Sequence, residues 1–145
     1  ASFGVGEKGR VVGVESSPLI AAVTGHGLQH FLPGNYPLYG AMRRIEVVNM
    51  DYLDYLRQQP DNAYDVVYFD PMFRKPLTAS NGISPLRSVA NHAALSVEAV
   101  EEAKRVARSR VVMKEANGSE EFGRLGFEKI MGGKYSKVHY GVMDL

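Results

Sequence analysis

The sequence lacks cysteine, a dominant charge sign and any long apolar run. Without cysteine the chain cannot form disulfides or use thiolate chemistry, and this favours a cytoplasmic protein. No stretch approaches the roughly 20 apolar residues of a transmembrane helix, and no secretory segment opens the chain, so we expect no membrane partner. Because the net charge is only +1, a nucleic-acid partner would have to be held by a local basic patch.

The composition that remains is that of a globular protein. Apolar residues make up 45% and charged residues 23% of the 145 positions, which argues against disorder. A chain of this length is most naturally one domain with a sizeable core. We therefore expect residues 1–145 to form a single domain.

The first residues contain Gly4, Gly6 and Gly9 at the spacing of a dinucleotide-binding fingerprint. That fingerprint requires a strand before the glycines and a helix after them. Here residues 1–5 resemble the tail of a helix, and residues 10–14 resemble a strand. The glycines therefore fit a helix-to-strand loop, with a C-cap role.

Strand-like and helix-like segments alternate along the rest of the chain. The expected strands cover 10–14, 45–49, 65–69 and 110–114, the expected helices cover 19–31, 52–58 and 96–108, a helical turn covers 39–44, loops cover 33–37 and 74–91, and a terminal hairpin joins 126–131 to 137–143. Alternation of this kind predicts an α/β fold, with helices on both faces of a mostly parallel sheet.

The segment around residue 68 is the most informative one. Val66, Val67, Tyr68 and Phe69 are consecutive apolar residues, which is typical of a central strand buried on both faces. Asp70-Pro71 follows, and proline cannot continue a ladder of hydrogen bonds. Asp70 is therefore expected at the carboxyl edge of the sheet, where open α/β sheets bind ligands.

Three expected strands end on or just before an acid, namely Glu15, Asp51 and Asp70. Three such acids in successive units suggest one shared ligand that is rich in hydrogen-bond donors. A carboxylate such as Glu15 can accept both hydroxyl protons of a ribose. Asp51 would accept from a base amine, and Asp70 with the Pro71 carbonyl would accept from a second amine.

Basic and aromatic residues follow or flank this edge. Phe73 could stack on a base, and the cations Arg74, Lys75, Arg87, Lys134 and Lys137 could line one rim. They would contact phosphate there, or else face solvent. Tyr135 could hold substrate or be a plain turn aromatic. His26 and His30, four residues apart, lack an identifiable third ligand, so we expect no metal site.

The sequence Asp70-Pro71-Met72-Phe73 resembles the motif of class I S-adenosylmethionine-dependent methyltransferases that act on amines. With methionine in its third position, the motif is similar to that of the bacterial family that methylates the exocyclic N2 of a guanine in small-subunit (16S) ribosomal RNA. The resemblance extends over most of the chain. It includes residues 14–22, 99–114 and 137–141.

The resemblance implies a Rossmann-like sheet, S-adenosylmethionine as cofactor, and 16S ribosomal RNA or the small ribosomal subunit as partner. The implied cofactor-binding residues are Glu15, Ser16, Asp51 and Asp70. The implied catalytic residues are Asp70, Pro71 and Phe73. The implied substrate-binding residues are Met72, Arg74, Lys75, Lys134 and Lys137.

Two departures from the family pattern qualify these expectations. Arg74-Lys75-Pro76 stands where a Pro-His-Lys type of sequence is usual. No segment matches the family's first strand and glycine-rich loop, so we predict weak or no cofactor binding by these 145 residues alone. Two other functions remain open: an adenine-N6 or DNA amino-methyltransferase, and a non-catalytic module that binds RNA or protein.

Overall fold

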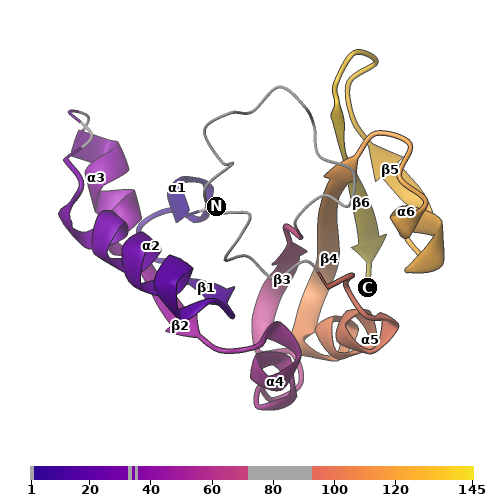
Figure 1. The fold of residues 1–145 in the computed structure, drawn as a ribbon, viewed down its shortest axis with the longest axis horizontal. Helices are drawn as coiled ribbons and strands as arrows, with labels where there is room; N and C mark the ends of the chain where they lie inside the picture. Colours follow the sequence, from indigo (N-terminus) through magenta and orange to yellow (C-terminus); the bar gives the residue numbers. More distant parts are fainter. Residues whose placement is uncertain (1, 33, 35, 72–92) are drawn as a thin grey trace. The chain divides into compact units, whose positions relative to one another are not determined.

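The computed structural model describes residues 2–32, 34, 36–71 and 93–145 (Figure 1). The described residues up to Tyr52 form one compact unit, and those from Leu53 onward form a second. Each unit combines strands with helices, in agreement with the predicted α/β class. The prediction of a single domain over residues 1–145 stays a prediction.

The elements follow one another in the order that the sequence predicts. The first unit holds α1 (Ser2–Val5), β1 (Val11–Glu15), α2 (Pro18–His30), α3 (Tyr36–Arg43) and β2 (Ile45–Asn49). The second holds α4 (Tyr52–Arg57, whose first residue lies at the boundary), β3 (Tyr64–Phe69), α5 (Val97–Val106), β4 (Ala107–Ala116), α6 (Glu121–Arg124), β5 (Lys129–Met131) and β6 (Val138–Asp144).

In the first unit, β1 and β2 form a parallel pair in which Glu15 lies opposite Asn49. Helix α2 runs along this pair (Figure 1). The helix begins as its sequence predicts, because the Ser17 hydroxyl accepts a hydrogen bond from the Ile20 amide and Pro18 occupies the first turn. The parallel pairing brings the two strand ends to one edge, where the predicted ligand residues lie.

The glycines near the amino terminus take the structural role expected of them. Helix α1 precedes them and β1 follows, so the order of elements is the reverse of a dinucleotide-binding fingerprint. Gly6 has a φ of +78°, a left-handed conformation that favours glycine after a helix.

The second unit contains a four-stranded sheet in the order β3-β4-β6-β5. Strands β3 and β4 are parallel, whereas β6 is antiparallel to both β4 and β5. The predicted terminal hairpin is therefore confirmed. In this register Phe69 lies opposite Met113, and Lys114 lies opposite Tyr140.

Helix α5 covers one face of this sheet. The Ser96 hydroxyl caps the helix by accepting from the Ala99 amide at 3.1 Å. The buried face of the helix consists of Ala99, Val100, Ala103 and Val106. These side chains and those of Val111 and Met113 on β4 form the centre of the core, and all six are at most 2% exposed.

The prediction that β3 is buried on both faces is wrong for the described residues. Phe69 is buried, whereas Val66 and Tyr68 are 47% and 49% exposed. Alternate residues of a strand point to opposite faces, so Val66 and Tyr68 lie on the face opposite Phe69. The run of apolar residues therefore predicts more burial of β3 than is observed among the described residues.

Several predicted boundaries also shift. The chain leaves α5 at Val106 and enters β4 at once, so Ala107 and Arg108 belong to the strand and not to the predicted helix. Helix α3 begins at Tyr36, inside the predicted loop 33–37, because proline is tolerated in the first turn of a helix. The short helix α6 has no counterpart among the predictions.

Among the described residues, β1 pairs only with β2, and β3 pairs only with β4 and no other strand. Each of these two strands therefore has one edge without a described partner. No helix in the described part of the chain is long and apolar enough to span a membrane.

Candidate functional site

The carboxyl end of β1 places Glu15 at the start of α2. Its Oε1 accepts a hydrogen bond from the Ser17 amide at 2.7 Å. Its backbone carbonyl accepts from the Met50 amide and from Asn49 Nδ2, which ties the ends of β1 and β2 together. Oε2 has no hydrogen-bond partner among the described residues, so this oxygen can accept a further hydrogen bond.

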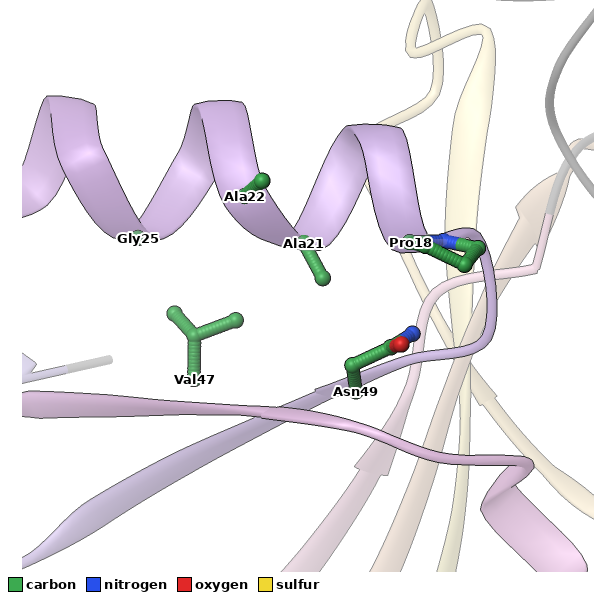
Figure 2. Close-up of a pocket in the computed structure, with 6 residues that line it drawn as sticks. All are labelled: Pro18, Ala21, Ala22, Gly25, Val47 and Asn49. Atoms are coloured by element: carbon green, nitrogen blue, oxygen red, sulfur yellow. The ribbon is translucent and has the colours of Figure 1, made fainter.

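A cavity of about 300 Å³ lies next to this edge, between α2 and β2. Figure 2 shows Val47 and Asn49 on β2 pointing toward the helix, with Ala21 pointing back toward them. The cavity exists because α2 presents small residues there, including Ala22 and Gly25. Its lining is apolar except for the Asn49 amide.

The carboxyl end of β3 places Asp70 beside Lys114 on the neighbouring strand β4. Lys114 Nζ lies 2.8 Å from Oδ1 and 2.8 Å from Oδ2 of Asp70, so one ammonium group contacts both carboxylate oxygens. The Asp70 side chain is 49% exposed and that of Lys114 is 27% exposed. Pro71 follows directly and is partly buried. The strand thus ends on an acid that is oriented by a fixed cation and still open to solvent.

Tyr68 lies two residues before Asp70 and therefore on the same face of β3. Partial burial, followed by the charges of Asp70 and Tyr140, raises the pKa of Tyr68 to about 12. Its phenol therefore remains a protonated hydrogen-bond donor even above pH 10, where an exposed tyrosine ionises.

The tip of the β5–β6 hairpin presents an exposed aromatic ring between two lysines. Tyr135 is 90% exposed, and Lys134 Nζ lies 5.6 Å from the centre of its ring. Lys137 is exposed on the other side of the turn. The turn itself is ordered by hydrogen bonds, including Ser136 N to the Gly133 carbonyl at 2.9 Å.

The predicted site residues lie in the first unit, in the second unit or outside the described part of the chain. Asp51 lies two residues after the end of β2 and, like Glu15 and Ser16, belongs to the first unit, whereas Asp70 and Pro71 lie in the second. That the three acids share one ligand stays a prediction. Five predicted residues lie outside the described part of the chain: Met72, Phe73, Arg74, Lys75 and Arg87.

His26 and His30 face one another on α2. Their rings stack with centroids 4.1 Å apart, and His30 Nδ1 contacts the His26 carbonyl. The described residues contain no cluster of three or more side chains that could ligate a metal ion.

Two residues at these strand ends carry interactions that the sequence analysis did not predict. Lys114 was assigned only to the end of a strand, and Asn49 only to the end of another. The charge pattern could have predicted the contact of Lys114, because β3 is followed by an acid and its parallel neighbour β4 has a lysine at the matching position. Polar residues that end buried strands are candidates for contacts across the sheet edge.

Residues 1–137 match the family model described as "Putative SAM-dependent methyltransferase". The chain belongs to this family. It is 45% identical over 144 residues to the uncharacterized protein YpiP of Bacillus subtilis, covering 99% of this chain and 56% of YpiP. The chain therefore spans about half the length of this curated relative.

A solved structure confirms the fold of this methyltransferase-family chain. The SAM-dependent methyltransferase NGO1261 of Neisseria gonorrhoeae superimposes with a TM-score of 0.64 at 20% identity, over 92% of this chain and 52% of NGO1261. The Rossmann-like class predicted from the sequence is thus correct. The family match and this fold make S-adenosylmethionine the cofactor of the family to which the chain belongs.

The residues present fit one part of this cofactor. Glu15 Oε1 is held by the Ser17 amide, while Oε2 remains an acceptor at the end of β1. A carboxylate in that place suits the hydroxyl groups of a ribose, which are hydrogen-bond donors. Ser16 lies beside it, and its carbonyl accepts from Asn49 Nδ2 at 3.2 Å, so the loop that would face the ribose is fixed.

Proposed function

We propose that this chain is part of an enzyme that transfers a methyl group from S-adenosylmethionine to an exocyclic amine of a nucleic-acid base, with guanine N2 of small-subunit ribosomal RNA as the favoured target. The observation that carries the proposal is the end of β3. There Asp70, 49% exposed and oriented by Lys114, is followed by Pro71, whose carbonyl is the second acceptor of the motif.

The chemistry of an aromatic amine explains why such acceptors are needed. Its lone pair is delocalised into the ring, so the amine is a poor nucleophile. The cofactor supplies an electrophilic methyl group on a sulfonium. Hydrogen bonds from the amine protons to the Asp70 carboxylate and the Pro71 carbonyl would orient the lone pair toward that methyl group and favour the developing positive charge.

A base must leave its stack to reach such a pocket, and a stacking ring beside the acid would hold it. We assign this role to Phe73, and substrate contact to Met72, Arg74 and Lys75, all of which lie outside the described residues. Asp51 is assigned an adenine contact. These assignments rest on the resemblance of the motif.

The β5–β6 hairpin tip supports RNA as the partner. Tyr135, 90% exposed beside Lys134, offers a ring face for a base, and both Lys134 and Lys137 can contact phosphates. Because the net charge of the chain is only +1, such a local group of cations has to supply the attraction.

Methyl incorporation from labelled S-adenosylmethionine tests the proposal in the full-length protein. We expect label in undermodified 16S ribosomal RNA or small subunits and N2-methylguanine on nucleoside analysis. Asp70→Ala should abolish incorporation. Asp65→Ala is the matched control, because Asp65 lies on the same strand but its side chain is 84% exposed and pairs only loosely with Arg108, at 3.5 Å.

The other outcomes separate the competing functions. Label in DNA or in N6-methyladenine would show an adenine-N6 or DNA amino-methyltransferase and would overturn guanine N2 of ribosomal RNA as the target. RNA binding without any incorporation, unchanged by Asp70→Ala, would show a non-catalytic binding module and overturn the proposal.

A further inference from the structure

The contact between Asp70 and Lys114 joins the two parallel strands of the second unit at their carboxyl ends. The register places Phe69 opposite Met113, so the next residue of each strand, Asp70 and Lys114, also come side by side. The ammonium nitrogen lies 2.8 Å from each carboxylate oxygen. These are the distances of charge-assisted hydrogen bonds.

The surroundings of Lys114 distinguish this contact from a loose surface pair. Its side chain is 27% exposed, compared with 56% for Lys129, which pairs with Asp144 on the same sheet. Tyr140 lies opposite Lys114 on β6, and Tyr68 is on the same face of β3. An ammonium group whose stem lies among neighbouring strands keeps a more defined position than one on a freely exposed side chain.

A carboxylate has about four lone-pair positions, and the contact with Lys114 engages one on each oxygen. The positions that remain are directed away from Lys114, and the bond between Cβ and the carboxylate cannot rotate without losing the ammonium contact. Asp70 therefore presents its free lone pairs in one direction. A neutral conjugated amine can share the carboxylate with Lys114, because its N–H groups can donate to the lone pairs that remain.

We infer that Lys114 is a positioning residue for methyl transfer: it fixes the orientation of the Asp70 carboxylate, and thereby the orientation of the amine that Asp70 holds. The inference rests on the proposed function, since it concerns the same acid. Lys114 acts through Asp70, and the reaction itself requires no proton or electron from it.

The test compares Lys114→Met with Lys114→Arg in the full-length protein, with Lys129→Met as the matched control. Methionine keeps much of the side-chain length but removes the charge, and arginine restores a cation. We expect kcat of Lys114→Met for RNA methylation to fall by about 10- to 100-fold, because misoriented reacting groups lose this much rate. KM for RNA should change by less than about threefold, because the group does not bind substrate directly.

Three further results are expected if the role is positional. Lys114→Arg should recover at least about a tenth of the wild-type kcat, since a cation again contacts the carboxylate. Lys129→Met should keep wild-type kcat. The midpoint of urea unfolding should stay the same in all three variants, because pairs this close to the surface contribute little to stability.

The outcomes distinguish this inference from the function on which it rests. If the wild type is active, Asp70→Ala is inactive and Lys114→Met has wild-type kcat, the positioning role is wrong and the proposed function stands. If Lys114→Met loses kcat only together with a matching loss of unfolding stability, Lys114 is structural and the inference fails. If the wild type transfers no methyl group, or Asp70→Ala is fully active, both are overturned.

Discussion

Glycine at position 141 of β6 provides space for two buried aromatic rings. A Cβ atom at Gly141 would lie 2.8 Å from Phe122 Cδ1 and 2.8 Å from both Cβ and Cδ1 of Phe127. Both phenylalanines are only 2% exposed, so neither ring can move aside into solvent. Inserting one methyl group into a packed core of this kind typically costs about 1–3 kcal/mol. Alanine also removes chain entropy from the unfolded state, which offsets roughly 0.5–1 kcal/mol of that cost.

The matched control is Gly133→Ala in the hairpin turn, where the nearest atom to a Cβ would be Ser136 Cβ at 3.9 Å. Both variants share the entropy gain, so their difference isolates the clash. We expect Gly141→Ala to unfold in urea with a free energy about 1–3 kcal/mol lower than Gly133→Ala, and Gly141→Val to lose more. Equal stability of the two alanine variants would show that β6 does not pack against Phe122 and Phe127 as described.

Three other outcomes follow from the structure. Ser96→Ala should lower the free energy of unfolding by about 1 kcal/mol in a urea titration, because it removes the cap of α5, and Ser96→Asp should restore it. Hydrogen bonds from Lys129 and then Arg110 lower the pKa of Asp144 from 3.8. The folded state should therefore lose this stabilisation as the pH falls below about 4. In acid-unfolding curves, Asp144→Asn should make that loss smaller. Because the pKa of Tyr68 is raised to about 12, the folded state should lose stability as the pH rises from 10 toward 12, and urea titrations of Tyr68→Phe should show a smaller loss.

The parts of the fold that sequence reasoning predicted well are those determined by neighbouring residues. Strand β2 was predicted with its observed bounds, because a β-branched run between turn residues specifies it locally. The start of α5 was predicted from Ser96 and the spacing of its buried face. The glycine fingerprint was rejected on the order of elements alone, and the structure has that order.

The parts that were missed depend on contacts between distant segments. Lys114 and Asp70 are 44 residues apart, and only the register of β3 on β4 brings them together. The exposure of Val66 and Tyr68 likewise depends on which face the neighbouring helices cover, and an apolar run by itself carries no such information.

The two strand-end acids that looked equivalent in the sequence differ in what they contact. Glu15 turns back onto the amide of Ser17, the residue whose hydroxyl caps α2. Asp70 reaches sideways to Lys114 and contacts no helix amide in the described structure. Loss of Glu15 would therefore disturb the helix start as well as any ribose contact, so a defect in a Glu15 variant cannot by itself be assigned to the cofactor. Among the described residues Asp70 contacts no helix start, and for this reason its substitution is the more direct test of the chemistry.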